Sequence, residues 1–468
     1  QMRNLKRALS LALAAIMLVG MMVVSASAAS YNNLTDKDEI VNKDAVSMLV
    51  SLGIIEGKPD GSYGPTENVD RAQMAKMLSV IMNKGVDNSA LYQSVNSGLV
   101  DVNTNWAKGH INYCYTTGII AGRGNGKFDP SATVTALEAA KMLLVAVGYD
   151  PAIEGFEGAD WAINVSVRAD EQGIFEGFTK DLSAPLNRDD AALLIYNALD
   201  VEMIQSYTTN NYPIAYSDHR TILADKYGVI KVQGVVVANE WASLASDDGD
   251  AALKEGKTTI YNGEGIFSTT GNTTVSKEDA SLKTQTFNVS TPVDMLGKTV
   301  NLYIKKTTIL ADSTVYGDPV VSDVNTVVTT GETVLYSGAK DPQVDYDKLL
   351  GENGLTDKDA KYFWNYNSGK YIPNTTEKYG DKTANVKGAT LTIIDNNGDG
   401  EVDYVLSVEK ALADITSVNS KKETVTVRTL GTLDNKDVVG YEDMAKEDVV
   451  LYVQYGGRTY LEKPEVVT

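Results

Sequence analysis

Two arginines, Arg71 and Arg188, stand at matching places in the chain, each directly after a helix-capping residue, Asp70 or Asn187. Because Asp and Asn side chains accept hydrogen bonds from the backbone at a helix start, both arginines are predicted at the first helical position. There a guanidinium group and the exposed N–H groups together favour a bound carboxylate or phosphate. The alternative is a solvated surface arginine. We expect both side chains to project from the helix start rather than into the core.

These arginines belong to a pattern that occurs three times. Each copy has an apolar helix that ends at a glycine, a glycine-rich loop closed by a proline, and a second helix. Three copies of one unit indicate a repeat array. Residues Gln73, Glu138 and Asp190, three positions after the caps, are interpreted as capping partners rather than ligand contacts. The first glycines of the three copies are Gly53, Gly118 and Gly173, and the caps are Asp70, Thr135 and Asn187.

The three copies resemble S-layer homology (SLH) domains, the modules that anchor bacterial surface proteins to the cell wall. In the second copy the matching motifs are residues 99–107 with Asp101 and Trp106, the loop 118–130, and the helix start 134–138. In the first copy they are residues 34–36, the loop 53–65 and the helix start 69–73. The resemblance covers residues 31 to about 204.

The resemblance implies an all-α, pseudo-threefold bundle that binds secondary cell-wall polysaccharide, typically with pyruvate-ketal sugars, in grooves between the repeats. In that family the helix-start arginines and loop glycines contact the polymer, and a tryptophan and an aspartate support the groove. A ketal carboxylate suits a fork-like cation, and close approach of a sugar suits glycine. By position, the implied residues are Arg71, Arg188, Gly57, Gly122, Trp106, Trp161 and Asp101.

The chain departs from the family pattern at several places. Ala136 stands where the second repeat should have its arginine, so we expect the groove of that repeat to be weakened or silent. Val41 replaces the tryptophan in the first repeat, and Lys180-Asp181 replaces the Asp-Gly turn in the third. The sequence therefore predicts one or two working sites rather than three.

The net charge and the first residues of the chain indicate which partners and which cellular compartment to expect. With 62 acidic and 42 basic residues, the formal charge of −20 argues against nucleic acid as the main partner. Residues 1–29 are predicted to be a signal peptide, because a basic start precedes an apolar run from Leu9 to Val24 and a small-residue cleavage site at 26–28. No later run approaches membrane-spanning length.

From about residue 206 the composition shifts to Thr, Val, Tyr, Asp and Gly, which predicts a mainly β region of sandwiches or small barrels. Residues 295–304 resemble 444–453, and both follow a strand that ends in asparagine, at Asn239 and Asn419, which suggests two related β modules. The predicted domains are the signal peptide at 1–29, SLH repeats at 30–95, 96–150 and 151–204, and β-rich modules at 205–340 and 341–468.

A possible calcium loop lies in the last module. Residues 395–403 have the alternating oxygen ligands and the glycine of such a loop, but Leu406 takes the place of the closing glutamate and the flanks are predicted strands. A calcium-binding β loop and a metal-free Asp/Asn/Gly hairpin turn both remain open. The candidate ligands are Asp395, Asn397, Asp399 and Asp403.

The sequence contains little material for catalysis. It has only two histidines, and no serine-nucleophile, phosphate-loop or zinc-protease motif is present. We therefore expect a secreted surface-layer or cell-surface protein without an enzymatic step, anchored polyvalently by its SLH repeats and able to self-assemble into a lattice. The alternatives are an SLH-anchored enzyme acting on polysaccharide, whose pair of carboxylates cannot be nominated from sequence, and an SLH-anchored adhesin.

Overall fold

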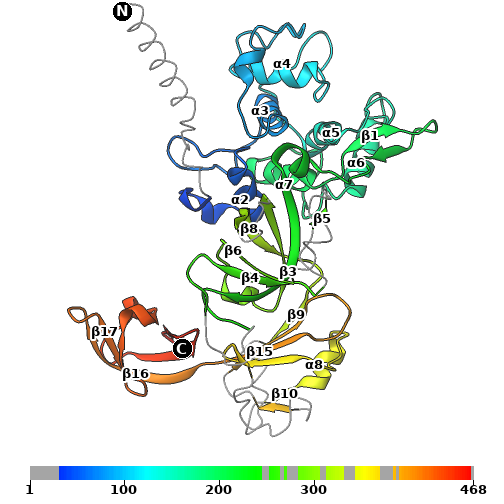
Figure 1. The fold of residues 1–468 in the computed structure, drawn as a ribbon. Helices are drawn as coiled ribbons and strands as arrows, with labels where there is room; N and C mark the ends of the chain where they lie inside the picture. Colours follow the sequence, from blue (N-terminus) through cyan, green and yellow to red (C-terminus); the bar gives the residue numbers. More distant parts are fainter. Residues whose placement is uncertain are drawn as a thin grey trace, which may run out of the picture. The chain divides into compact units, whose positions relative to one another are not determined.

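The computed structural model describes residues 31–244, 252–263, 268–270, 283–305, 312–330, 343–368, 383–385 and 389–464 (Figure 1). The predicted signal peptide lies outside these residues. The chain divides into two compact units, Gln1–Ile230 with Thr270–Thr273, and Lys231–Thr269 with Thr274–Thr468. Each unit is described by itself below. In the part of the chain that the structure describes, no helix is both long enough and apolar enough to cross a membrane.

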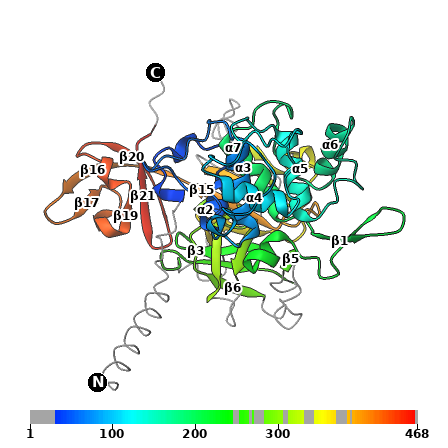
Figure 2. The same cartoon turned by 90° about the horizontal axis from the view of Figure 1, so that it is seen from above.

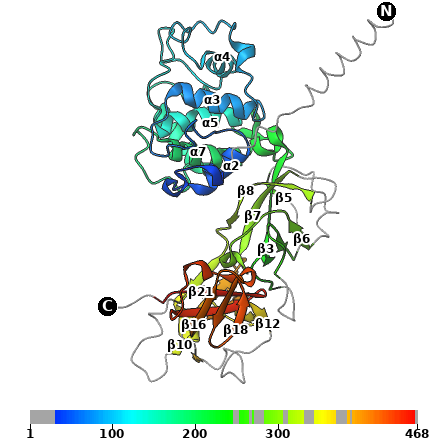
Figure 3. The same ribbon diagram turned by 90° about the vertical axis from the view of Figure 1, so that its left-hand side faces the viewer.

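The first unit is helical, with two helices in each repeat. The α-helices among the described residues of this unit are α2 (Lys43–Ser51), α3 (Arg71–Met82), α4 (Lys108–Thr116), α5 (Ala136–Val147), α6 (Trp161–Glu171) and α7 (Arg188–Leu199). The second helix of each repeat packs against the first helix of another repeat: α3 against α4, α5 against α6, and α7 against α2. Figure 3 shows α3 beside α4 and α7 beside α2. A hairpin of β1 (Ile204–Tyr207) and β2 (Pro213–Ala215) follows α7.

The capping chemistry predicted for the second helices is confirmed. Asp70 and Thr135 each form a capping box with the residue three positions on, Gln73 or Glu138. At the third helix, the Asn187 side chain accepts from the Asp190 N–H. These caps fix where α3, α5 and α7 begin, so Arg71, Ala136 and Arg188 all stand at the first helical position.

Three buried residues just before these helices join the repeats in a closed cycle. The Val69 N–H donates to the Leu186 carbonyl at 2.8 Å, the Leu186 N–H to Val134 at 2.7 Å, and the Val134 N–H to Val69 at 2.9 Å. All three side chains are buried. Each repeat therefore contacts both others at one point, and the second helix of each repeat starts beside the loop of a different repeat.

The second unit is mainly β, as predicted. One sheet has the order β6-β4-β3-β7-β8, with β5 beside β3, and another has the order β18-β17-β16-β20-β21-β19. Figure 2 labels β16, β17, β19, β20 and β21 of the second sheet. The strands of the first sheet are β3 (Val229–Asn239), β4 (Thr258–Tyr261), β5 (Ser268–Thr270), β6 (Thr284–Phe287), β7 (Thr299–Lys305) and β8 (Thr314–Val321). Those of the second are β16 (Ala411–Asn419), β17 (Thr424–Val427), β18 (Gly431–Asp434), β19 (Val438–Val439), β20 (Val449–Tyr455) and β21 (Arg458–Glu462).

These two sheets are related in the way that the sequence echo suggests. Strands β3 and β16 both end in an asparagine, and each is the central neighbour of the strand that carries the repeated segment, β7 or β20. A short 3-10 turn precedes both segments, Val293–Met295 before β7 and Tyr441–Asp443 before β20. The strand order is also the same from β6 to β8 as from β18 to β21. The prediction of sandwiches or small barrels stays a prediction.

A third sheet lies between these modules in the sequence, with the order β12-β11-β15-β14-β9. Its strand β9 precedes residue 340 and β14 follows it, so this sheet draws strands from both predicted β modules. Helix α8 (Tyr346–Glu352) packs its buried Tyr346 and Leu350 against the sheet. The strands are β9 (Thr326–Thr329), β11 (Lys361–Trp364), β12 (Asn367–Ser368), β14 (Ala389–Asp395) and β15 (Tyr404–Glu409), and β10 (Gln343–Asp345) pairs separately with β13 (Thr383–Asn385).

Candidate ligand-binding grooves

An aspartate holds each of the first two loops in place. Asp36 accepts from the N–H groups of Tyr63 and Gly64 at 2.7 and 2.8 Å, and Asp101 accepts from Phe128 and Asp129 at 2.9 and 2.8 Å. Burial opposes ionisation of Asp101, but these backbone N–H bonds outweigh it and lower the pKa of the carboxyl group. The structure therefore places Asp101 as the support of a loop, with its carboxylate already hydrogen-bonded to the backbone.

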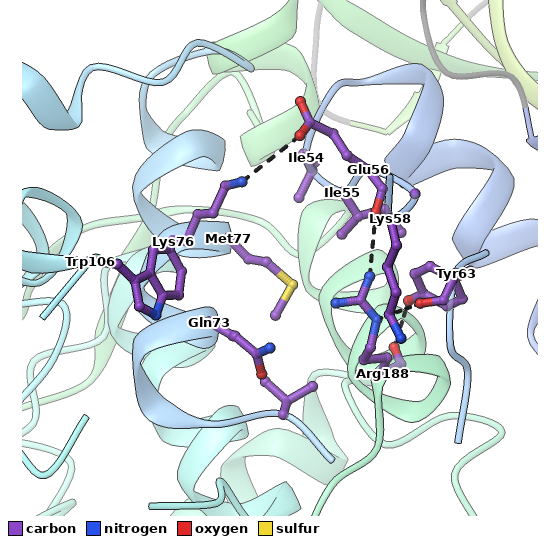
Figure 4. A pocket seen from close by; sticks show the side chains of 12 residues that line it. Ile54, Ile55, Glu56, Lys58, Tyr63, Gln73, Lys76, Met77, Trp106 and Arg188 are labelled. Carbon is purple, nitrogen blue, oxygen red and sulfur yellow. Dashed lines mark hydrogen bonds and ion pairs between the residues drawn. The ribbon is translucent and has the colours of Figure 1, made fainter. Parts of the chain in front are cut away.

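The first loop forms one wall of a cavity of about 220 Å³, here called groove 1. Figure 4 shows Trp106, Lys76 and Gln73 on one side of the cavity and Lys58 and Arg188 on the other. The full lining is Ile54, Ile55, Glu56, Gly57, Lys58, Tyr63, Val69, Gln73, Lys76, Met77, Trp106 and Arg188. The loop and helix α3 come from repeat 1, the tryptophan from repeat 2 and the arginine from repeat 3.

Arg188 is half-buried in groove 1 and is not part of an ion pair among the described residues. Its Nε donates to the Tyr63 carbonyl at 2.8 Å, Nη2 donates to the Glu56 carbonyl at 3.4 Å, and the guanidinium lies 4.7 Å from the Tyr63 ring centre. Its Nη1 has no protein partner in the described part of the chain. The side chain is thus fixed by two carbonyls and a ring while donor capacity remains for a carboxylate.

The second loop forms a larger cavity of about 480 Å³, here called groove 2. It repeats the construction of groove 1, with loop and helix α5 from repeat 2, Trp161 from repeat 3 and Arg71 from repeat 1. The full lining is Arg71, Ile119, Ala121, Gly122, Arg123, Glu138, Lys141, Met142, Phe156, Glu157, Gly158 and Trp161. The predicted arginines, loop glycines and tryptophans are therefore divided between two grooves, each assembled from all three repeats, whereas Asp101 lines neither.

Arg71 differs from the prediction, because its side chain is only 4% exposed. Its Nε donates to the Phe128 carbonyl at 2.9 Å, Nη2 donates to the Ala121 carbonyl at 2.8 Å, and the guanidinium lies 4.4 Å from the Phe128 ring centre. Burial lowers its pKa to about 10, so the group stays charged at neutral pH. Arg71 therefore joins repeat 1 to repeat 2 as well as lining groove 2.

The prediction that Ala136 weakens the groove of repeat 2 is wrong, because this alanine lies beside the loop of repeat 3. We expected this alanine to weaken the groove of repeat 2, because the arginine was assigned to the loop of its own repeat. The structure shows that the helix start of one repeat serves the loop of another: the Arg71 N–H donates to Ala132 at 3.0 Å, and the Arg188 N–H to Glu67 at 2.8 Å. Groove 2 therefore has its arginine, Arg71. Ala136 lies next to Leu137, whose N–H donates to the Leu182 carbonyl in the loop of repeat 3 at 3.1 Å.

Sequence reasoning missed the other cations of both grooves. Lys58 and Arg123 follow the loop glycines Gly57 and Gly122 directly, and Lys76 and Lys141 each stand six residues after a helix cap. The repetition of a basic residue at two aligned positions was the signal that could have identified them.

These cations have different partners in the two grooves. Lys58 pairs with Glu67, and Lys76 lies 3.9 Å from Glu56, in groove 1. In groove 2, Arg123 pairs with Glu138 at 2.8 Å. Lys141 donates to the Phe156 carbonyl at 2.5 Å and lies 5.7 Å from the Trp161 ring centre. Both grooves thus combine several cations with one tryptophan.

The fold of the protein itself requires glycine at position 122 and leaves little room for a side chain at position 57. A Cβ atom on Gly122 would lie 2.8 Å from the Lys127 carbonyl oxygen, and one on Gly57 would lie 3.1 Å from the Leu34 side chain. The contact at Gly122 is too close for any real side chain, since the nearby atom belongs to the backbone. These glycines therefore allow the loop to fold against its own repeat, whether or not a sugar approaches them.

The candidate calcium residues form the turn between β14 and β15. The carboxylate of Asp395 is buried and accepts from the N–H groups of Asn397, Gly398 and Gly400 at 3.1, 2.7 and 2.9 Å. Asp403 accepts from Asn396, and burial raises its pKa. Among the described residues, no group of three or more His, Cys, Asp or Glu side chains is arranged to hold a metal ion. Backbone hydrogen bonds therefore account for the turn, and the metal site stays a prediction.

Comparison with known proteins identifies two of the three repeats. The S-layer homology domain model matches residues 33–75 and 100–140, which lie in repeats 1 and 2. A cell surface protein of Thermoanaerobacter kivui is 28% identical over 270 residues, 57% of this chain and 32% of that protein. An S-layer protein of Bacillus licheniformis is 33% identical over 113 residues, 24% of this chain and 12% of that protein. An amylopullulanase of Thermoanaerobacterium thermosulfurigenes is 31% identical over 172 residues, 34% of this chain and 9% of that enzyme.

The chain spans less than a third of the length of each of these relatives. The family match and the surface-protein relatives confirm the predicted resemblance and indicate a secreted protein of the cell wall or cell surface. The chain therefore carries S-layer homology domains at residues 33–75 and 100–140.

Proposed function

We propose that the helical unit anchors the protein to the cell wall by non-covalent binding of a secondary cell-wall polysaccharide between its repeats. The observation that carries this proposal is the construction of the grooves. In each, an arginine that is fixed by backbone carbonyls, and whose Nη1 has no hydrogen-bond partner among the described residues, meets a lysine and a tryptophan around one cavity. Cations and an aromatic face together suit a sugar that carries a negative charge.

The ligand chemistry follows from the same groups. A carboxylate, such as the one on a pyruvate-ketal sugar, can accept from the free side of Arg188 and be attracted by Lys58 and Lys76 across groove 1. Trp106, which is 58% exposed, offers an apolar face to the sugar ring. Because these charges are partly exposed, binding should weaken as the salt concentration rises.

We also propose that the three repeats form a pseudo-threefold bundle. The closed cycle of hydrogen bonds through Val69, Val134 and Leu186 supports it, and so does the exchange of helix starts between loops. A bundle of this kind gives more than one groove on one rigid body, so weak contacts to a repeating polymer add through effective concentration.

The β unit is proposed to be a displayed structural region that takes part in a surface lattice, without a catalytic step. The S-layer name of one relative supports this role. An SLH-anchored glycosidase is the alternative, because another relative is an amylopullulanase. Lattice formation by the purified chain, seen by electron microscopy, would support the structural role, whereas release of reducing sugar from polysaccharide would support the enzyme.

The anchoring proposal predicts that residues 31–468 co-sediment with purified cell walls. Walls from which the secondary polysaccharide has been extracted should retain little of the chain, and removal of ketal groups alone should weaken binding if a carboxylate is the recognised group. Sedimentation with native, extracted and ketal-free walls measures both losses of binding, and repeating it at several salt concentrations measures the electrostatic part. Equal retention on extracted and native walls would show that another wall component is bound.

We further propose calcium at the β14–β15 turn, on the spacing of its oxygen ligands alone. Titration of the chain with calcium chloride in a calorimeter should give heat that Asp399→Ala abolishes. Asp434→Ala, which removes an exposed carboxylate at the end of β18, is the matched control. If the unmodified chain gives no heat, the segment is a hydrogen-bonded hairpin turn without a metal.

A further inference from the structure

The two grooves share one rule of assembly. Each combines the loop and second helix of one repeat with a tryptophan from the following repeat and an arginine from the preceding one. Applied once more, the rule defines a third position from the loop and helix α7 of repeat 3, residue 41 of repeat 1 and residue 136 of repeat 2.

The backbone around this third position is assembled like the other two. The N–H groups of Val41 and Asn42 donate to the Asp189 carboxylate at the start of α7, both at 3.2 Å. On the other side, the Leu137 N–H donates to the Leu182 carbonyl at 3.1 Å. Residue 41 is therefore held at the start of helix α7 and residue 136 beside the loop of repeat 3. Trp106 and Arg188 hold the corresponding places in groove 1.

The side chains at this position are different. The arginine is replaced by Ala136 and the tryptophan by Val41. The basic residue after the loop glycine is Phe178, and the lysine six residues after the helix cap is Leu193. The third position thus lacks the arginine, the tryptophan and the two further basic residues that grooves 1 and 2 share.

Leu193 also occupies the space beside the loop. Its Cδ2 lies 3.7 Å from where a Cβ atom on Gly177 would be, so the leucine packs against the loop glycine. The nearby Lys180 donates to the Asp190 carboxylate at 2.5 Å, and the Asp190 side chain is only 10% exposed. This lysine is held by the carboxylate of its own repeat and is directed to the helix start.

We infer that the helical unit is a two-site binder, in which grooves 1 and 2 hold the acidic glycan and the third position binds none. The inference rests on the proposed function and adds the number of glycan-binding sites in each chain. Two departures from the family pattern, Val41 and Ala136, lie in different repeats but remove their groups from the same position. The remaining two grooves therefore keep complete sets of side chains.

Calorimetric titration of residues 31–468 with short oligosaccharides released from purified wall polysaccharide tests the valency. We expect two sites per chain, one site for Lys76→Glu or Lys141→Glu, and two for Lys180→Ala, which lies at the third position. A melting curve by circular dichroism confirms that each variant is folded before titration.

The outcomes separate the inference from the proposed function. Two sites that fall to one with either lysine variant support the inference. Three sites, or a loss of one site with Lys180→Ala, overturn the inference while anchoring stands. A single site in the unmodified chain also overturns it, because one of the two complete grooves is then inactive. If no oligosaccharide binds at any concentration, the proposed function fails, and the inference fails with it.

Discussion

Replacing Lys76 and Lys141 together by glutamate should release the protein from purified cell walls. Each substitution puts a carboxylate where one groove has a cation, so an acidic sugar is repelled from both grooves at once. Because two linked sites raise the avidity for a polymer by about 10²–10⁴ over one site, either single variant should bind roughly that much more weakly and the double variant should not be retained. Co-sedimentation over a range of protein concentrations measures the three apparent affinities.

The matched control is Lys43→Glu with Lys84→Glu. These two lysines are exposed, belong to the same helical unit and contribute to neither groove, while the change in net charge is the same. The control should keep nearly all wall binding at moderate salt. A control that loses as much binding as the groove variant would mean that overall charge, rather than the two grooves, holds the protein on the wall.

The local features of the helical unit could be predicted from the sequence because they depend on near neighbours. Capping at Asp70, Thr135 and Asn187 and the ends of the loops involve residues a few positions apart. The same reasoning identified three repeats and the positions of Arg71 and Arg188. The structure adds which groove each arginine serves.

The partners of the arginines could not be predicted because they are set by contacts between repeats. Arg188 meets a loop more than a hundred residues earlier in the chain, through bonds to Tyr63 and Glu56. A pattern read along one repeat assigns the arginine to the loop of that repeat. This assignment placed the effect of Ala136 in the wrong groove, and only the hydrogen bonds between repeats corrected it.

In the β unit, the sequence predicted strands and an echo between two modules, but not the sheet between them. The echo could be detected because β7 and β20 carry similar residues in strands with equivalent neighbours. The middle sheet joins β9 to β14 across more than fifty residues. Alternation of apolar residues gives no information about which distant strand is the partner.

Replacing Arg71 by alanine should destabilise the helical unit, which separates this residue from Arg188. The buried Arg71 side chain satisfies the carbonyls of Ala121 and Phe128 and contacts the Phe128 ring, so its removal leaves two acceptors and a cavity between repeats 1 and 2. Leaving the two buried acceptors unpaired should cost about 2–4 kcal/mol of folding free energy in Arg71→Ala. Arg188→Ala should cost about 1 kcal/mol, because Arg188 is half-buried and only one of its two hydrogen bonds is short.

Urea unfolding followed by helical circular dichroism measures both variants, and wall binding is then compared only under conditions where each is folded. Arg71→Lys keeps the charge but cannot donate to both carbonyls in the same fork, so its stability should lie between Arg71→Ala and the unmodified chain. An equal, small cost for the alanine variants at both positions would contradict the structural role. Arg71 would then be, like Arg188, chiefly a residue of its groove, and the joint between repeats 1 and 2 would depend on the hydrogen bonds of Val69 and Val134.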